Sequence, residues 1–387
     1  MNKENQRAII VLGMHRSGTS AISGGIANMG VEFGDHLMPA APDNPRGFWE
    51  NEGVVEINDK LLDIAGMNWS SVREFPVEIF ESTAVDSLKS EARSLLVKHF
   101  ANVSLWGIKD PRLCRLLPFW QSVFEDLKVN VNYLFIVRNP QNVFRSLKAR
   151  NGFNEERAHW LWVRYILDVF KYIESVPVHA VSYDQLIKDS NKTLSEVSAS
   201  LNLSAVDQGG DTSTIDPSLQ SHEGEIVFIR PGFSISQVAS GLYDAMKKSE
   251  FKGLSTSPVF INALALAQKE VVRLQEVALY TDLLADLTDS VVNKEKDSYE
   301  EVIAQKNRAI SELNQEIGLL RGEALSSQET LQEKNEKLQE KNERLASKSL
   351  VINDLQLELD ELRQSFSWRI TAPYRFVSVG VKKLFRF

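Results

Sequence analysis

The feature that most constrains this chain is a short apolar run followed by a glycine-containing loop and a helical pattern. Residues 8–12 (AIIVL) form the continuous, β-branched run that is typical of a strand buried on both faces. The loop GMHRSGTS comes next, and residues 20–29 repeat their apolar side chains at helical spacing. A strand, a glycine loop and a helix in this order begin a βαβ unit, so the sequence predicts an α/β fold with a parallel sheet and flanking helices.

Three later runs, at 105–108, 133–137 and 178–181, also have the pattern of parallel strands, and they end in the polar residues KDPR, RNP and SYD. Ligands of open α/β sheets bind at the carboxyl ends of the strands, so we expect these residues to converge with the GMHRSGTS loop. Helical patterns fill the gaps and are expected at 52–65, 85–99, 140–150, 155–175 and 183–201, near Ser236, and at 261–292.

The composition of the chain changes twice after these helices. We expect a first domain at 1–292, with a core at 6–205, a loop or lid at 206–235 that is rich in Gly, Asp, Ser and Thr, and a helical extension at 236–292. The segment 293–364 has apolar residues seven apart from Ile303 to Leu359, and LQEKNEK is followed directly by LQEKNER.

Such heptads predict a coiled coil, although Lys334, Lys341 and Lys348 interrupt the second apolar position in its centre. At 1.5 Å per residue, one continuous helix here is on the order of 90–100 Å long. We expect it to act as a rod that joins copies into a homo-oligomer; the alternative is a single solvated helix.

The last segment, 365–387, interleaves Arg and Lys with Phe, Trp and Tyr and contains no acidic residue. This composition favours contact with a membrane surface, and the alternative is packing on the chain's own domain or on a partner.

Bulk properties exclude several classes of protein. A net charge of −8 argues against a general nucleic-acid binder. The single cysteine, Cys114, allows no intrachain disulfide, as suits a reducing cytoplasm. No run of 18 apolar residues is present, and the first apolar run is too short for an export signal. We therefore expect a cytoplasmic protein whose tail can reach the inner membrane face.

The loop GMHRSGTS has the skeleton of the phosphate-binding loop G-x-x-x-x-G-K-[ST], but Thr19 occupies the lysine position and the cation is Arg16. Its backbone N–H groups and the following helix start form an anion cradle. Ser17 and Ser20 add hydroxyl donors, and Arg16 adds a forked cation. Because the lysine that bridges β- and γ-phosphates is missing, phosphoryl transfer is poorly supported. A glycine turn without function is the remaining interpretation.

The loop resembles the 5′-phosphosulfate loop of sulfotransferases that use 3′-phosphoadenosine 5′-phosphosulfate (PAPS), with Arg16 in the cation position. The second hallmark of that family binds the 3′-phosphate and consists of an arginine after a strand and a serine eight residues later. FIVRNPQNVFRSL supplies Arg138 and Ser146 at this spacing. WGIKDPR and AVSYDQL resemble two further family segments, which implies that Lys109 faces the transferring group and that Tyr183 lies near the nucleotide.

This resemblance covers about 6–205, extends more loosely to 290, and excludes the heptad segment. It implies PAPS as co-substrate, with donor contacts from His15, Arg16, Ser17, Gly18, Thr19, Ser20, Arg138, Ser146 and Tyr183. No metal is implied, and the histidines show no metal-ligand spacing.

Sulfuryl transfer needs a base for the acceptor proton and cations for the developing negative charge. The segment PRGFWENE resembles the part of carbohydrate and tyrosyl-protein sulfotransferases that works with a glutamate. We take Glu50 as the base, Glu52 as its alternative, and Lys109 and Arg16 as catalytic cations. A helix-start residue favoured by the helix dipole is the non-catalytic interpretation of Glu50.

Two resemblances indicate the acceptor. The GFWE segment resembles that of bacterial carbohydrate-type members, and SFSWRITAPYR resembles C-terminal segments of bacterial glycosyltransferases of surface-polysaccharide assembly. They imply a saccharide hydroxyl on a bacterial surface glycan or its lipid-linked precursor. Two other functions stay open: a P-loop kinase or NTPase, and a non-catalytic, degenerate sulfotransferase domain on a coiled-coil scaffold.

Overall fold

The computed structural model describes residues 6–41, 44, 47–173, 178–203, 234–251, 253–326 and 339–361, with the backbone alone at 288–299 and 320–326. The predicted loop at 206–235, except its last two residues, lies outside the described residues, as does the whole tail at 365–387. The chain divides into two compact units, Met1–Asp282 and Leu283–Phe387.

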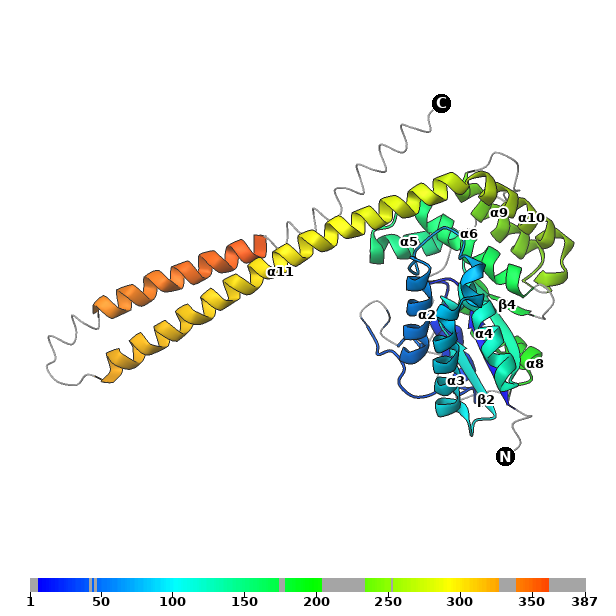
Figure 1. Cartoon of the computed structure of the whole chain (residues 1–387), viewed down its shortest axis with the longest axis horizontal. Coiled ribbons are helices and arrows are strands. Elements are labelled where there is room, and N and C mark those ends of the chain that lie inside the picture. The colour runs from blue at the N-terminus through cyan, green and yellow to red at the C-terminus, as the bar shows by residue number, and fades with distance from the viewer. Residues whose placement is uncertain are drawn as a thin grey trace, which may run out of the picture. The chain divides into compact units, whose positions relative to one another are not determined.

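The centre of the first unit is a four-stranded parallel sheet in the order β2-β1-β3-β4 (Figure 1). The strands are β1 (Arg7–Leu12), β2 (Leu105–Lys109), β3 (Asn130–Val137) and β4 (Val178–Ser182). All four predicted strands are confirmed, and the register pairs Ile10 of β1 with Ile108 and with Tyr133. The chain passes from β1 to the edge strand β2, whereas β3 pairs with the opposite side of β1, so the strand order reverses at β1. Ligands of open α/β sheets bind at such a reversal, so we expect the ligand-binding loops at the carboxyl end of β1.

Both faces of the sheet are covered, which explains the continuous apolar runs. Ala8, Ile10 and Leu12 join one core cluster, and Ile9 and Val11 join another on the opposite face. The second cluster also contains residues of α1 (Thr19–Ala27), α7 (Tyr183–Lys188) and α8 (Ser190–Leu201), and the first contains residues of the remaining long helices.

These remaining helices are α2 (Glu52–Ile64), α3 (Asp86–Phe100), α4 (Leu113–Leu127), α5 (Pro140–Asn151), α6 (Glu155–Tyr172), α9 (Ile235–Lys248) and α10 (Pro258–Arg273), with short 3₁₀ turns at Val77–Glu81, Thr83–Val85 and Leu254–Thr256. Two predicted helices are each split in the structure. The pattern at 183–201 breaks at Asp189, whose side chain caps α8, and the pattern at 261–292 breaks at Leu274. None of the described helices is both long and apolar enough to cross a bilayer.

Helix α4 was absent from the sequence prediction. Its apolar side chains do follow one face of the helix, but Pro118 lies inside it and interrupts the helical composition of the segment. The start of α4 directly follows the polar segment after β2, so it lies where the sequence predicts the site.

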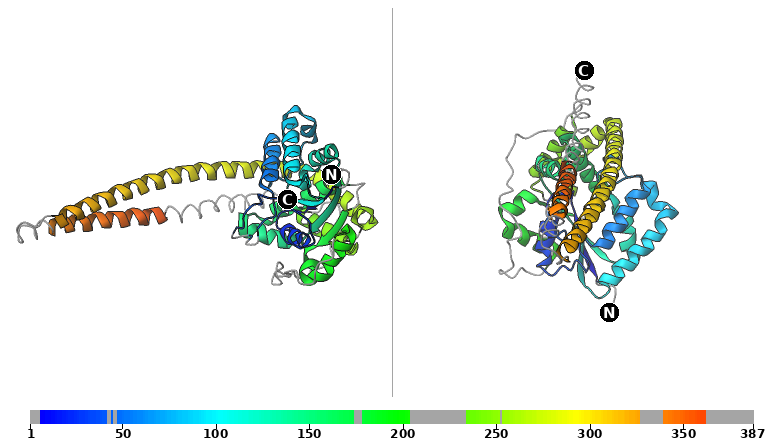
Figure 2. Two further views of the ribbon diagram at one scale, coloured as in Figure 1. Left: turned by 90° about the horizontal axis from the view of Figure 1, so that it is seen from below. Right: turned by 90° about the vertical axis from the view of Figure 1, so that its left-hand side faces the viewer.

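The second unit contains most of α11 (Gln275–Ser326) and a further helical segment at 339–361. The later segment runs antiparallel beside α11 (Figures 1 and 2): Lys306 pairs with Glu358, and Glu316 pairs with Lys348. Ile317, Leu345 and Ile352 form a small buried cluster between them. The expected single rod is therefore wrong for the described heptads, because the later ones return along the earlier ones within one chain. Residues 327–338 lie outside the described part, and pairing between chains stays a prediction.

Candidate active site

The loop after β1 is held in a strained conformation beside the other strand ends. Arg16 has a φ of 68°, a left-handed value that costs a non-glycine residue about 1–3 kcal/mol. Gly18 precedes α1 with a φ of 93° and no side chain caps the helix. No acidic residue occurs in the first turn of α1, so the exposed N–H groups at this end favour a negatively charged ligand.

The structure brings together the two anion-binding groups predicted from the sequence. Arg16 Nε donates a 2.8 Å hydrogen bond to Ser146 Oγ on α5, and Arg138 Nη1 approaches the Arg16 carbonyl at 3.4 Å. The Arg138 guanidinium also lies 4.8 Å from the centre of the Tyr183 ring. A Cβ on Gly18 would meet that ring at 2.1 Å, so glycine is required there for the tyrosine to pack against the loop. Residues from three other chain segments therefore converge on the loop.

Lys109, the last residue of β2, supplies a cation next to the loop position where the usual lysine is missing. Its ammonium nitrogen donates to Glu50 Oε1 at 2.6 Å, to the Phe48 carbonyl at 2.7 Å and to Ser20 Oγ at 3.2 Å. Asn44 Nδ2 also donates to Ser20 Oγ, at 3.2 Å. The Ser20 hydroxyl is thus occupied by cationic and neutral donors, in an arrangement that opposes a second cation such as Mg²⁺ at the same oxygen.

Burial sets the titration of this ion pair. Burial raises the pKa of Glu50 above 4.5, although the positive charge of Lys109 acts to lower it. Burial also lowers the pKa of Lys109 below 10.5, although the negative charge of Glu50 acts to raise it. The two pKa values therefore move toward each other, and the carboxyl becomes a stronger base than an ordinary exposed glutamate.

Asp110 and Arg112 support the site without facing it. Asp110 is fully buried and accepts hydrogen bonds from Asn58 Nδ2 at 2.9 Å and from the Arg112 backbone N–H at 2.9 Å. Arg112 also forms an ion pair with Asp59 at 2.7 Å. These bonds fix the segment that carries Lys109.

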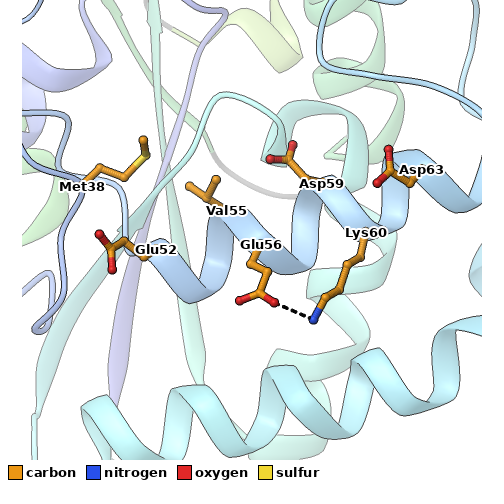
Figure 3. Close-up of a pocket in the computed structure, with 7 residues that line it drawn as sticks. All are labelled: Met38, Glu52, Val55, Glu56, Asp59, Lys60 and Asp63. Carbon is orange, nitrogen blue, oxygen red and sulfur yellow. Dashed lines mark ion pairs between the residues drawn. The ribbon is translucent and has the colours of Figure 1, made fainter. Parts of the chain in front are cut away.

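Glu52, the alternative base, lies apart from the Lys109–Glu50 pair. It is exposed at the start of α2 and lines a cavity of about 440 Å³ (Figure 3) with Met38 and five further residues of α2: Val55, Glu56, Asp59, Lys60 and Asp63. Lys60 and Glu56 form an ion pair there at 2.9 Å. The geometry favours Glu50 over Glu52 as the group that can act together with Lys109.

The Trp49 side chain points inward. The residue has a left-handed φ of 58°, and its ring packs at 5.4 Å on Phe33 and against Gly24 of α1. This conformation turns the neighbouring Phe48 carbonyl and Glu50 carboxyl toward Lys109, so Trp49 acts as an anchor of the segment.

Several buried polar atoms of the site have no hydrogen-bond partner among the described residues: Ser17 Oγ, His15 Nε2 and Arg138 Nε. Unsatisfied buried donors are costly and mark places where a ligand completes the hydrogen bonding. The donor chemistry, hydroxyl, imidazole, guanidinium and helix N–H, suits a ligand with more than one oxyanion, as the sequence-based assignment of a doubly phosphorylated nucleotide requires.

Sequence reasoning missed several contacts of the site. The Gly13 N–H donates to Cys114 Sγ at 3.2 Å, and Asn44 bonds Ser20. The Trp69 ring lies 4.6 Å from the His15 ring. Cys114 follows the KDPR segment closely and was detectable by its position, whereas Asn44 and Trp69 come from irregular segments whose paths no periodicity reports.

Within the described residues, no group of three or more His, Cys, Asp or Glu side chains is arranged to hold a metal ion.

No protein-family model matches the chain, and no curated protein matches it significantly. Among solved structures, the chain is similar to the sulfotransferase domain from the curacin biosynthetic pathway, with 17% identity and a TM-score of 0.37 over 63% of this chain and 98% of that one. It is also similar to the sulfotransferase domain from the Synechococcus PCC 7002 olefin synthase, with 17% identity and a TM-score of 0.35 over 69% of this chain and 96% of that one. At this identity and these TM-scores, the function has to be inferred from the chain's own residues.

Proposed function

We propose that this chain is a sulfotransferase that moves a sulfuryl group from PAPS to a hydroxyl of a saccharide, on a surface glycan or its lipid-linked precursor. The observation that carries the proposal is the convergence of Arg16, Arg138, Ser146 and Tyr183 around the loop, with Lys109 and Glu50 on the loop's other side. One group of residues is suited to hold a nucleotide with two anionic ends, and the other to hold a reacting centre.

The donor residues have distinct tasks. The α1 N-terminus, Ser17, Thr19 and Ser20 offer N–H and hydroxyl donors to the phosphosulfate end, and Arg16 adds a charge-assisted bond. Arg138 and Ser146 are assigned to the 3′-phosphate and Tyr183 to the nucleotide base. PAPS supplies an activated sulfuryl group bonded to a good leaving group.

The acceptor side depends on Glu50 and Lys109. Glu50 accepts the proton of the acceptor hydroxyl while the acceptor oxygen forms its bond to sulfur. Lys109 donates a hydrogen bond to the oxygen whose bond to sulfur breaks, and stabilises the charge left on the departing phosphate. The 2.6 Å contact between the two side chains, beside Ser20, supports these assignments, because the proposed base and the proposed cation lie next to each other.

A P-loop kinase or NTPase is the competing function. It is disfavoured because Lys109 donates to Ser20 Oγ, the hydroxyl that would ligate Mg²⁺ in such an enzyme. Incubation of the protein with ³⁵S-labelled PAPS and a cell-envelope fraction tests the proposal. We expect a labelled saccharide that is absent with Glu50→Gln; ATP hydrolysis without any sulfate transfer would support the competing function instead.

A degenerate, non-catalytic domain is the third possibility. It predicts that Arg16→Ala and Glu50→Ala proteins still support function in cells, whereas the proposed enzyme requires both residues. Homo-oligomerisation through the heptads and membrane contact through the tail at 365–387 belong to the proposal as well, and would place the enzyme at the inner membrane face.

A further inference from the structure

A second cluster of side chains lies around His15 of the loop. His15 packs against Trp69 with 4.6 Å between ring centres and against Tyr165 with 5.9 Å. The guanidinium of Arg150 lies 5.2 Å from the centre of the Trp69 ring. Phe153 stacks on Trp69 at 5.7 Å. Trp69 therefore holds a histidine and an arginine next to the catalytic loop.

The charged groups that act most strongly on His15 are cations. His15 Nε2 is buried without a hydrogen-bond partner in the described part of the chain. Burial lowers the pKa of His15 well below 6.5, and the charged groups with the largest effect on it, Arg112, Arg150, Lys109 and Arg16, lower it further. Lys109 and Arg112 are themselves ion-paired, with Glu50 and with Asp59 and Asp110, so Arg150 is the cation of this cluster that we assign to an incoming anion.

Arg16 lies between the groups assigned to the donor and His15. Burial lowers the pKa of Arg138, and among charged groups both Arg138 and His15 are affected by Arg16. Arg16 contacts Ser146 and Arg138, the groups assigned to the 3′-phosphate, while the charge of Lys109, the partner of Glu50, also acts on His15.

The segment that carries Trp69 is rigidly supported by buried side chains. Three of its backbone carbonyls accept hydrogen bonds from buried side chains: Trp69 from Tyr165 at 2.8 Å, Ser71 from Arg115 at 2.7 Å and Val72 from Arg164 at 3.3 Å. Two of its N–H groups, those of Val72 and Arg73, donate to the Asp282 carboxylate at 2.6 Å and 3.0 Å. A segment already fixed in this way loses little conformational entropy when a ligand binds. Such support is typical of a binding surface rather than of a loop that only connects two helices.

We infer that His15, Trp69 and Arg150 form an acceptor subsite that binds an oxyanion, a carboxylate or a phosphate group, carried by the saccharide. The inference rests on the proposed sulfotransferase function for the identity of the reaction, and it adds that the acceptor is acidic. His15, which the sequence assigned to the donor, here donates its unpartnered Nε2–H to the acceptor's anion. Arg150 supplies the charge, and Trp69 positions both side chains.

Binding is measured by calorimetry and by histidine NMR, in protein saturated with 3′-phosphoadenosine 5′-phosphate. The probes are methyl glucuronide for a carboxylate, glucose 6-phosphate for a phosphate, and methyl glucoside as the neutral control. We expect at least one acidic probe to bind about tenfold or more tightly than methyl glucoside, the effect of one charge-assisted contact. The same probe should raise the pKa of His15, whose signal is assigned with His15→Gln.

The matched variants lie on one helix. Arg150→Gln should weaken binding of the acidic probe by about tenfold and leave the affinity for methyl glucoside unchanged. Arg145→Gln, at an exposed position of α5, should change neither affinity. Equal binding of acidic and neutral probes, or no binding of any, overturns the inference. If Arg150→Gln instead weakens the bisphosphate nucleotide as strongly as the probe, the cluster serves the donor and the subsite assignment is wrong.

Failure of the proposed function gives a different pattern. Should wild-type protein not bind 3′-phosphoadenosine 5′-phosphate at all, the donor assignment fails. The acidic probes are then titrated into the nucleotide-free protein, where a charge preference lost in Arg150→Gln still supports an anion subsite.

Discussion

Lys109 Nζ lies 2.6 Å from Glu50 Oε1, and the two side chains are only 2% and 8% exposed. A buried ion pair of this kind is costly to break, because removing one partner leaves a buried charge and destabilises a protein by about 3–5 kcal/mol. The pair is also the point at which the proposed base and the proposed leaving-group cation meet. Its effects on stability and on catalysis therefore have to be separated by the choice of variant.

Glu50→Gln keeps an oxygen that can accept the Lys109 hydrogen bond but removes the basic carboxylate. We expect turnover to fall by about 10²–10⁴-fold while the bisphosphate nucleotide binds as before. The matched control is Glu52→Gln at the exposed start of α2, which should stay close to wild-type activity. Steady-state rates and calorimetry measure both quantities. A fully active Glu50→Gln, or a Glu52→Gln that is the inactive member of the pair, rules out Glu50 as the base.

The pH dependence of kcat/KM follows from the same pair. Glu50 must be ionised to accept a proton, and burial raises its pKa above 4.5, so activity should be lost on acidification at a higher pH than for an ordinary glutamate. Lys109 must be protonated, and burial lowers its pKa below 10.5, so activity should be lost on the alkaline side earlier than for an ordinary lysine. A pH–rate profile with its acid limb at or below 4.5 would contradict this explanation.

Gly18 and Gly30 form a matched pair for the packing of the loop. Their φ values are 93° and 89°, but a Cβ on Gly18 meets the Tyr183 ring at 2.1 Å, whereas nothing lies within 4 Å of one on Gly30. Gly30→Ala should cost about 1 kcal/mol from backbone strain alone. Gly18→Ala should cost about 1–3 kcal/mol more from overpacking, and should weaken nucleotide binding because Tyr183 supports Arg138. Thermal or denaturant unfolding compares the two, and equal losses would show that Tyr183 does not pack on the loop.

The antiparallel helical pair can be tested by cross-linking. Lys306 and Glu358 are ion-paired, and the chain's single native cysteine, Cys114, is buried. The double variant Lys306→Cys/Glu358→Cys, treated with a short bifunctional maleimide, should form a cross-link within one chain. The cross-linked protein should shift slightly on a denaturing gel but still migrate as a monomer. Covalent dimers as the main product would show that the heptads pair between chains instead. Each single variant is the control for random cross-linking.

The sequence predicted the sheet and the convergence of its strand ends well, because a parallel strand buried on both faces needs a continuous apolar run. The runs at 8–12 and 133–137 both became strands with alternate residues in the two cores. Helix α4 was not predicted because Pro118 lies inside it and an internal proline normally argues against a helix, although the apolar residues of α4 do follow one face.

Contacts between elements were harder to predict from the sequence than the positions of the elements along the chain. Heptads show which face of a helix is apolar but not what covers it, so the return of 339–361 along α11 was not foreseen. Likewise, the sequence placed His15 and Lys109 beside the loop, but the path of the irregular segment with Trp69 depends on long-range hydrogen bonds to Arg115, Arg164 and Asp282. No local pattern records such contacts.

The most direct test of the central claim is a calorimetric comparison of two nucleotides that differ only in the 3′-phosphate. Wild-type protein should bind 3′-phosphoadenosine 5′-phosphate about tenfold or more tightly than adenosine 5′-phosphate, and Arg138→Ala should abolish that difference, because a hydrogen bond to a charged group contributes about 1.5–3 kcal/mol. Equal affinity for the two nucleotides, or tight binding of Mg²⁺–ATP in place of both, would contradict the assignment of this site to a sulfuryl donor.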